Sequence, residues 1–231
     1  LKDKTESFKS ALSSDPISAF GGIVSCNFKI NKKLALELNK LFLEVIIGIN
    51  FDHDALKILK KKKNLRLIDA SNFTLSEILR FNSANENILI QSEDKKVFKK
   101  SDFKIVSKKK PSNLLLNNLI FAFNVCRYVK SNAIVLASNK SIIGIGSGQT
   151  SRLDSCQIAI DKMRKFTKPS SDIVAASDAF FPFVDGIEKL VQSGVKAVIQ
   201  PSGSIKDKEV IKFANETDTV LVFSKTRHFR H

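Results

Sequence analysis

Short apolar runs alternate with amphipathic stretches along the first part of the chain. Val45–Ile47 is a continuous apolar run typical of a buried strand, whereas Leu56 and Leu59 recur at helical spacing. This alternation is typical of a layered α/β domain. We expect, in chain order, a helix over 3–13, a strand at 23–24, a helix from its cap Asn31 to Phe42, a strand at 45–47, a helix capped by Asp52 and a strand over 65–68.

The pattern weakens after Ser71, where polar stretches leave only two weak strands, near 88–91 and 95–98. The charged run Lys108–Lys110 directly precedes Pro111, and charge combined with proline indicates a connecting segment. We therefore expect a boundary at this point. It would divide the chain into a first unit over residues 1–110 and a second unit over 111–231.

Strand and helix signals alternate again after this boundary. Ser151 and Asp154 resemble the start of a capping box, and apolar residues share one face of the helix that follows. The expected elements are a helix ending near Val129, strands at 133–137 and 142–145, a helix over 152–165, a helix over 185–193, a strand over 196–200, a helix over 206–216 and a strand over 219–223. The pattern supports an α/β fold of two units.

Three phenylalanines surround a proline in the segment Ser177–Phe183. Pro182 lacks a backbone donor and favours extended geometry at Phe181, so the segment is expected to be a loop. Loops are normally polar, and an aromatic loop usually packs against something. Two interpretations remain open: packing in the core or at a subunit contact, or the wall of a ligand pocket.

A glycine run, Gly144-x-Gly146-x-Gly148, lies between an expected strand and an expected helix. It differs from the dinucleotide-binding fingerprint because Gln149 replaces the third glycine, and it lacks the Gly-Lys-Ser/Thr of a P-loop. The glycines can simply allow close backbone approach. Alternatively, Arg152 at the start of the helix could meet an anion or a carboxamide together with backbone donors.

Composition excludes several classes of protein. The chain has 231 residues, of which 43% are hydrophobic, and no apolar run reaches the ~18 residues of a membrane helix. Cys26, Cys126 and Cys156 are odd in number and far apart, which disfavours a disulfide framework or a zinc site and fits a reducing cytosol. No metal site is expected from these residues.

The formal net charge of +15 raises the alternative of a nucleic-acid partner. The densest basic runs are Lys60–Lys63 and Lys108–Lys110, and neither contains an aromatic residue on which a base could stack. Lys, Asn, Ile and Phe are abundant together, as expected from an AT-rich coding sequence. We therefore interpret the charge as a solvated surface and expect neither a nucleic-acid nor a membrane partner.

Several separated segments together resemble one known family, in the same order along the chain. This family is the bifunctional purine biosynthesis protein, in its aminoimidazole carboxamide ribonucleotide (AICAR) transformylase part. The segments that carry the resemblance are Asp15–Gly22, Glu44–Ile47, Lys130–Ala133, Gly144–Arg152, Ser177–Phe183, Pro201–Ser204 and Arg227–His231.

The resemblance implies a fold and a reaction. The fold is α/β with two cytidine-deaminase-like α/β/α units, the first (1–110) truncated at its N-terminus and the second over 111–231. The reaction is formyl transfer from the co-substrate 10-formyltetrahydrofolate to AICAR, in de novo synthesis of inosine monophosphate. A cytoplasmic homodimer with shared active sites is implied, together with a potassium ion in some members. The runner-up interpretation is a non-catalytic module that binds purine nucleotide or folate.

The resemblance also assigns roles to individual residues. Asn132 and His231 match catalytic positions. Positions that match substrate-binding residues are Gly21, Glu44, Asn132, Arg152, Phe180, Arg227 and Phe229. Positions that match folate-binding residues are Ile17, Leu153, Asp185, Ser204 and Ile205.

Each assignment has a simpler structural alternative. Asn132 can be a turn or helix-capping residue, and Asp185 can be the N-cap of the helix that follows. The basic C-terminal tail can be merely solvated. Transfer chemistry gives Asn132 a sharper role, because the amine of AICAR is a poor nucleophile whose neighbouring carboxamide must be oriented, and a side-chain amide presents both a donor and an acceptor.

The sequence also departs from the family pattern. The family's Lys-His-x-Asn-Pro motif, which supplies the oxyanion-stabilising Lys and the proton-accepting His, is absent, as is the cyclohydrolase domain. Gly48-Ile49-Asn50 replaces the usual Ala-Pro-Gly, and Val184 replaces an Arg. We therefore expect a C-terminal fragment that is inactive in formyl transfer by itself.

Overall fold

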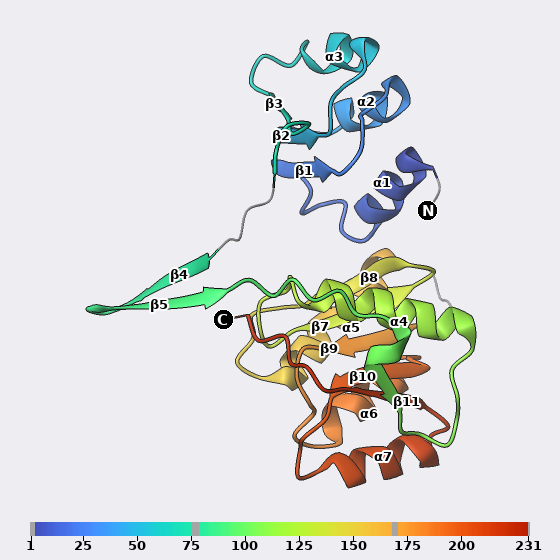
Figure 1. The fold of residues 1–231 in the computed structure, drawn as a ribbon. Coiled ribbons are helices and arrows are strands. Elements are labelled where there is room, and N and C mark those ends of the chain that lie inside the picture. Colours follow the sequence, from blue (N-terminus) through green and yellow to red (C-terminus); the bar gives the residue numbers. More distant parts are fainter. Residues whose placement is uncertain (1–2, 75–78, 168–170, 231) are drawn as a thin grey trace. The chain divides into compact units, whose positions relative to one another are not determined.

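The computed structural model describes residues 3–74, 79–167 and 171–230 and divides into two compact units, Leu1–Glu93 and Asp94–His231 (Figure 1). Both units combine helices with β-sheet, so the α/β fold class is confirmed. Among these residues no helix has the length and apolar character needed to cross a membrane.

The first unit is built on a three-stranded parallel sheet in the order β1-β2-β3. Its elements are α1 (Lys4–Ser13), β1 (Gly22–Cys26), α2 (Lys32–Asn39), β2 (Leu43–Gly48), α3 (His53–Leu59) and β3 (Arg66–Asp69). The Asn31 side chain accepts from the Leu34 N–H at 3.0 Å, so the predicted cap of α2 is confirmed. Leu34 and Leu38 on α2 pack with Ile46 of β2 in the core of this unit.

Two details of the first unit differ from the prediction. Helix α2 ends at Asn39 rather than near Phe42, because Leu43 already lies buried in β2 and the chain must turn before it. Asp52 does occupy the N-cap of α3, but its carboxylate makes no capping hydrogen bond and pairs instead with Lys29 at 2.8 Å.

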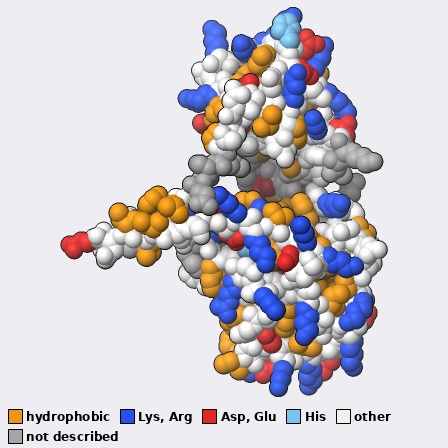
Figure 2. Space-filling view, in the orientation of Figure 1, with side chains coloured by type: hydrophobic (Ala, Val, Ile, Leu, Met, Phe, Trp, Pro, Cys, Tyr) orange, Lys and Arg blue, Asp and Glu red, His pale blue; other side chains and the backbone are white. Residues whose placement is uncertain are grey.

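A two-stranded hairpin, β4 (Leu79–Ala84) and β5 (Asn87–Ser92), follows the sheet of the first unit. The predicted strand at 88–91 is confirmed. Figure 1 shows the hairpin, and Figure 2 shows its exposed apolar side chains. Phe81 and Ile90 oppose each other in the register and are 62% and 59% exposed. The predicted strand at 95–98 does not form, because Phe98 is drawn into the core of the second unit.

The second unit contains a mixed six-stranded sheet in the order β6-β11-β10-β9-β7-β8. Strands β9, β10 and β11 are parallel, whereas β7 is antiparallel to β9 and β8, and β6 is antiparallel to β11. The strands are β6 (Phe103–Ile105), β7 (Ile134–Ser138), β8 (Ser141–Gly146), β9 (Val174–Ser177), β10 (Ala197–Pro201) and β11 (Val220–Ser224).

Helices cover both faces of this sheet, which gives three layers. A short 3₁₀ helix, Lys100–Asp102, precedes β6, and the α-helices are α4 (Asn113–Cys126), α5 (Arg152–Phe166), α6 (Asp185–Gln192) and α7 (Asp207–Glu216). Val135 and Ala137 of β7 pack on the α4 side, whereas Ile134 and Leu136 pack with α5 and α6. This alternation follows from the period of two along a strand.

The boundary between the units lies earlier than predicted. The structure divides the chain after Glu93, whereas the charged run before Pro111 favoured a boundary at residue 110. Strand β6 pairs with β11, and the Ser107 hydroxyl accepts from the Leu221 N–H at 2.8 Å, so this segment belongs to the second sheet. Three residues of strand are too few to give a periodic signal.

The glycine run allows α5 to lie directly on β8. A Cβ atom at Gly144 would come within 2.1 Å of the Ala159 carbonyl oxygen, and one at Gly146 within 1.9 Å of the Ser155 carbonyl oxygen. Gly148 has φ +68° and open space, with the nearest atom to a Cβ at 3.7 Å. Close backbone approach is therefore the physical reason for glycine at the first two positions.

We predict that Gly146→Ala destabilises the protein by about 3 kcal/mol, since the clash is with backbone and no side chain can yield. The matched control is Gly148→Ala, which should cost only about 1 kcal/mol of left-handed backbone strain. Urea unfolding followed by circular dichroism measures both. An equal loss for the two variants would contradict direct contact between α5 and β8.

Candidate functional site

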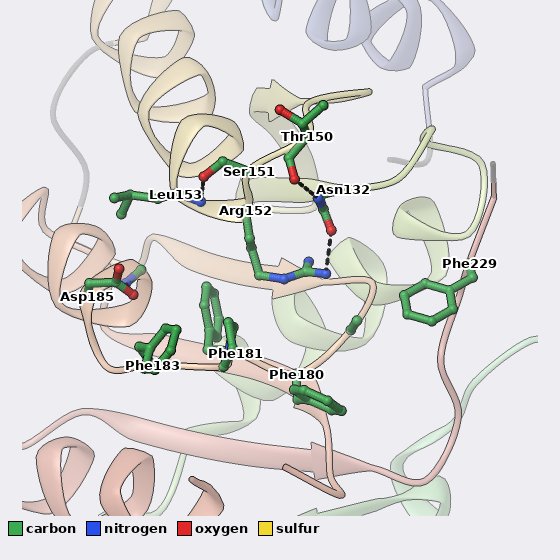
Figure 3. Close-up of a pocket in the computed structure, with 13 residues that line it drawn as sticks. Asn132, Thr150, Ser151, Arg152, Leu153, Phe180, Phe181, Phe183, Asp185 and Phe229 are labelled. Carbon is green, nitrogen blue, oxygen red and sulfur yellow. Dashed lines mark hydrogen bonds between the residues drawn. The ribbon is translucent and has the colours of Figure 1, made fainter. Parts of the chain in front are cut away.

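A cavity of about 470 Å³ lies in the second unit, where the carboxyl end of β9 meets the start of α5 (Figure 3). The carboxyl ends of parallel strands are the usual ligand side of an α/β sheet. The cavity is lined by Asn132, Thr150, Ser151, Arg152, Leu153, Ala179, Phe180, Phe181, Pro182, Phe183, Asp185, Gly186 and Phe229. Six of these residues were predicted from the resemblance to bind substrate or folate, and Asn132 was also predicted to be catalytic.

The aromatic loop contributes both to the core and to the lining of the cavity. Phe181 is 1% exposed and belongs to the core cluster between the sheet and helices α5–α7. Phe183 is 60% exposed, and with Phe180 it presents an aromatic wall to the cavity. A Cβ at Gly186 would lie 2.6 Å from the Phe181 ring, so the start of α6 closes directly over this ring. The buried Phe181 ring thus fixes the loop that carries Phe180 and Phe183 at the cavity.

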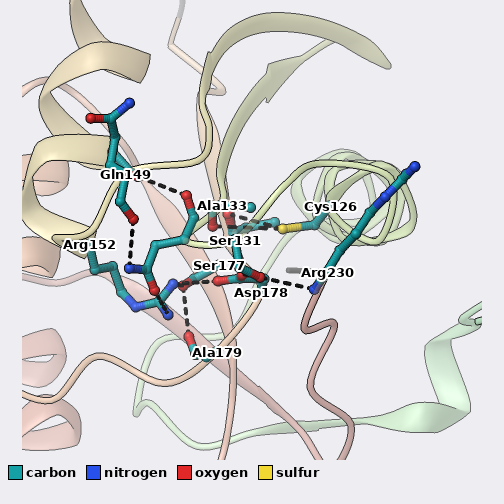
Figure 4. A network of polar contacts seen from close by, with 12 residues as sticks. Cys126, Ser131, Ala133, Gln149, Arg152, Ser177, Asp178, Ala179 and Arg230 are labelled. Atoms are coloured by element: carbon teal, nitrogen blue, oxygen red, sulfur yellow. Dashed lines mark hydrogen bonds and ion pairs between the residues drawn. The ribbon is translucent and has the colours of Figure 1, made fainter. Parts of the chain in front are cut away.

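A buried ion pair connects α5 to the end of β9 (Figure 4). Arg152 Nη1 lies 2.5 Å from Asp178 Oδ1 and 2.9 Å from Ser177 Oγ. The Asp178 side chain is fully buried and that of Arg152 is 10% exposed. The other Asp178 oxygen accepts from the Ser131 hydroxyl at 2.5 Å, so both oxygens of this buried carboxylate are satisfied.

This network fixes the orientation of the Asn132 amide. Its Nδ2 donates to the carbonyl oxygens of Gln149 and Thr150, both at 3.0 Å, and its Oδ1 accepts from Arg152 Nη2 at 2.8 Å. A guanidinium only donates and a carbonyl only accepts, so the opposite orientation would leave all three contacts unfavourable. Both amide protons are therefore engaged, and the remaining lone pair of Oδ1 is the group that Asn132 can offer to a ligand.

The thiols near the network are poor nucleophiles. Burial is the main reason that the pKa of Cys126 is raised well above its usual value, and the nearby Asp178 carboxylate raises it further. Burial likewise raises the pKa of Cys156 to about 12. Because thiolates are the reactive form, neither side chain is suited to covalent chemistry. Cys156 packs in the core cluster between the sheet and α5–α7.

The C-terminal segment borders the cavity on the side opposite Asp185 (Figure 3). Phe229 lines the cavity, and the Arg227 guanidinium lies 4.5 Å from the Phe180 ring centroid and 5.8 Å from that of Phe229. Both side chains are exposed. His231, the other residue predicted in this segment, lies outside the described residues.

Two predicted residues of the second unit are not part of the cavity lining, and a third has a different structural role from the predicted one. Ser204 and Ile205 are in the β10–α7 loop, where Ile205 is 99% exposed. The predicted N-cap role of Asp185 is wrong: Val184 is the N-cap, and the Asp185 carboxylate accepts from the Gly186 N–H at 2.7 Å. Because Asp185 is already inside the first turn, its side chain remains at the cavity surface.

Three predicted residues belong to the first unit. Gly21 has φ +71°, and a Cβ there would lie 3.9 Å from the Glu44 carboxylate, so these two positions are neighbours. Ile17 is 63% exposed. The structure describes this unit by itself, and a role for these residues in a common site stays a prediction.

Sequence reasoning missed the residues that support the site rather than line it. Ser131, Ser177 and Asp178 were quoted within motifs without a role. An acid directly after a serine at the end of a strand was the available signal. The alternation between buried and exposed positions could not tell that the Asp178 carboxylate turns inward to a particular arginine.

Comparison with known proteins agrees with the motifs. The family model described as "AICARFT/IMPCHase bienzyme" matches residues 1–162. Among curated relatives, the bifunctional purine biosynthesis protein PurH of Persephonella marina is 43% identical over 228 residues, and that of Leptospira biflexa is 45% identical over 228 residues. Both alignments cover 98% of this chain and 44% of the relative, so the chain spans less than half the length of these proteins.

We predict that Asp178→Asn lowers the free energy of unfolding by about 3 kcal/mol, because it leaves the buried Arg152 cation without its counter-charge. Asp185→Asn, at the exposed rim of the same cavity, is the matched control and should change stability by less than about 0.5 kcal/mol. Chemical denaturation at neutral pH measures both. Equal stability of the two variants would show that the ion pair contributes nothing net.

Proposed function

The chain belongs to the AICARFT/IMPCHase bienzyme family, and on this premise we propose that its cavity takes part in formyl transfer to AICAR. The formyl donor is 10-formyltetrahydrofolate. The amine nitrogen of AICAR forms a bond to the formyl carbon, and the bond from that carbon to N10 of the folate breaks. The amine nitrogen loses one proton, and N10 gains one. The products are formyl-AICAR and tetrahydrofolate.

The observation that carries this proposal is the fixed acceptor of Asn132. The amine of AICAR has its lone pair delocalised into the ring, so it reacts only when it is held in position. An Oδ1 already bonded to Arg152 keeps one lone pair in a set direction, and it can accept from the amine or from the neighbouring carboxamide. Because the amide is locked by three hydrogen bonds, little reorganisation is needed when the substrate binds.

Asn132 acts here as an orienting group and not as a base. A neutral amide oxygen is too weakly basic to keep the amine proton, so proton removal falls to another group. The resemblance assigns it to a Lys-His pair that this sequence does not contain. We therefore propose that the described cavity supplies binding and orientation, and that turnover requires further residues.

We propose that the two ends of the cavity bind different ligands. At one end, Arg227 and Phe229 suit a nucleotide: a guanidinium stacked on a ring by its face keeps its in-plane donors for a phosphate. At the other end, Leu153 and Asp185 suit the pterin of a folate, whose N–H groups need an acceptor. The aromatic wall contributed by Phe180 lies beside the path between them.

The residues present fit the folate co-substrate. A cavity of about 470 Å³ is within the usual range for a small-molecule site, and its exposed aromatic rings match a flat heterocycle. Val184, where the family usually has Arg, leaves this end without a cation from that position. Ser204 and Ile205 are not among the residues that line this cavity.

The potassium ion implied by the family has no ligands assigned here. Within the described ranges, no group of three or more His, Cys, Asp or Glu side chains is placed to hold a metal ion. The buried carboxylate beside the cavity, Asp178, is neutralised by Arg152.

Three further features complete the proposal: the type of fold, the assembly and location, and the role of the basic surface. We infer that both units are cytidine-deaminase-like, which the three-layered second unit supports. We also propose a cytoplasmic homodimer with shared sites, as the family resemblance implies, and the exposed apolar residues of the β4–β5 hairpin support an interface. The basic surface is proposed to be solvated, with no nucleic-acid partner.

We predict that Asn132→Ala lowers kcat by about 10²-fold in the protein expressed from its complete gene, because a contact tuned to the reacting amine is lost. Arg227→Ala should instead raise the KM for AICAR by about 10- to 100-fold with little change in kcat, since a phosphate contact is uniform along the reaction. Steady-state kinetics with 10-formyltetrahydrofolate measure both.

Circular dichroism must first show that both variants are folded, because Asn132 also anchors the loop at Gln149 and Thr150. Wild-type kcat for Asn132→Ala together with loss of kcat for Arg227→Ala would reverse the two assignments. Tight AICAR binding by the wild-type protein without any turnover would favour the non-catalytic alternative.

A further inference from the structure

We propose that His228 is a positioning residue, which holds the C-terminal segment so that Arg227 and Phe229 face the cavity. The identity of the ligand that these two residues meet rests on the proposed function. The anchoring itself rests on the contacts of the described chain.

The side chains of residues 227–230 point alternately toward the cavity and into the protein, as in any extended chain. Arg227 lies over Phe180 and Phe229 lines the cavity, whereas the intervening His228 is fully buried on the other side. Arg230, the next residue on the His228 side, donates to the Tyr128 carbonyl oxygen at 2.8 Å. The buried side therefore fixes the register that presents the ligand side.

His228 is held by both polar and aromatic contacts. Its Nδ1 lies 2.6 Å from Asp94 Oδ2, and because a carboxylate only accepts, Nδ1 carries the proton. The imidazole packs edge-on against Phe98, with centroids 4.9 Å apart at 89°, and against Phe123 at 4.6 Å. Its backbone N–H donates to the Asp178 carbonyl oxygen at 2.9 Å.

The C-terminal segment is hydrogen-bonded to the residues that support Asn132. The Arg230 N–H donates to Ser131 Oγ at 3.1 Å, and the Ser131 N–H donates to the Arg230 carbonyl oxygen at 2.9 Å. Ser131 also donates to Asp178, the partner of Arg152. Loss of the His228 side chain leaves these backbone bonds near Asn132 in place but removes the contact nearest Arg227 and Phe229. The expected defect is thus in substrate binding rather than in the chemical step.

The surroundings of His228 favour its neutral form over its protonated form. Its Nε2 is buried without a hydrogen-bond partner in the described structure, so a second proton would have no acceptor. Burial lowers the pKa of His228, as does Arg127, while the carboxylates of Asp94 and Asp178 oppose the shift. Below pH 6.5, the ordinary value for His, the unfolded chain binds more protons, so this residue makes stability fall as pH falls.

The test uses His228→Phe, which keeps an aromatic ring between Phe98 and Phe123 but removes the bond to Asp94. In the protein from the complete gene, we expect the KM for AICAR to rise about tenfold with kcat within about twofold of wild type. Asp94→Asn keeps a neutral acceptor and should give about a threefold rise. The double variant should be no worse than His228→Phe, because both changes remove one interaction.

Two controls separate anchoring from general weakening of the core. Leu119→Ala truncates a fully buried residue of the same cluster and should lower stability without changing the KM for AICAR. Hydrogen exchange measured without ligand should speed up at the His228 amide in His228→Phe and stay slow there in Leu119→Ala under native conditions. The fall in stability below pH 6.5 should also be smaller in His228→Phe than in wild type.

The outcomes distinguish this proposal from the proposed function. If exchange at the His228 amide is faster in His228→Phe but the wild-type protein does not bind AICAR, the positioning role of His228 is supported and AICAR is refuted as the ligand. Unchanged exchange and unchanged KM in His228→Phe would overturn the positioning role. An additive double variant would overturn the role of the bond to Asp94.

Discussion

The buried ion pair between Arg152 and Asp178 is the interaction on which the rest of the site depends. A buried guanidinium or carboxylate costs folding free energy unless it is paired with an opposite charge. Each group must also satisfy its remaining hydrogen-bonding atoms. Arg152 does so through Ser177 and Asn132, and Asp178 does so through Ser131. The pair thereby ties the start of α5, the end of β9 and the loop before β7 to one another.

Close packing of α5 on β8 brings the first half of this pair into place. Glycine at 144 and 146 lets the helix backbone lie against the strand, and Ser151 then caps the helix by accepting from the Leu153 and Asp154 N–H groups. The helix therefore begins at Arg152 itself. A larger residue at either glycine would displace the helix and, with it, the guanidinium.

Local sequence signals predicted the elements well but not the supports of the site. The Asn31 and Ser151 caps, the glycine run and the aromatic loop each depend on residues close in sequence, and the structure confirms the caps and the close approach. Strand β6 and the contact between Asp94 and His228 depend on partners more than 100 residues away. Three residues of strand, or a single histidine, carry no periodic signal of such a partner.

The two arginines of the site are suited to different tasks because their surroundings differ. Arg152 is nearly buried and donates to three side chains, so binding a phosphate would require it to leave the buried Asp178 carboxylate. Arg227 is exposed and rests on aromatic rings, a contact that uses the face of the guanidinium and not its donors. We therefore propose that an incoming anion meets Arg227, while Arg152 orients the Asn132 amide.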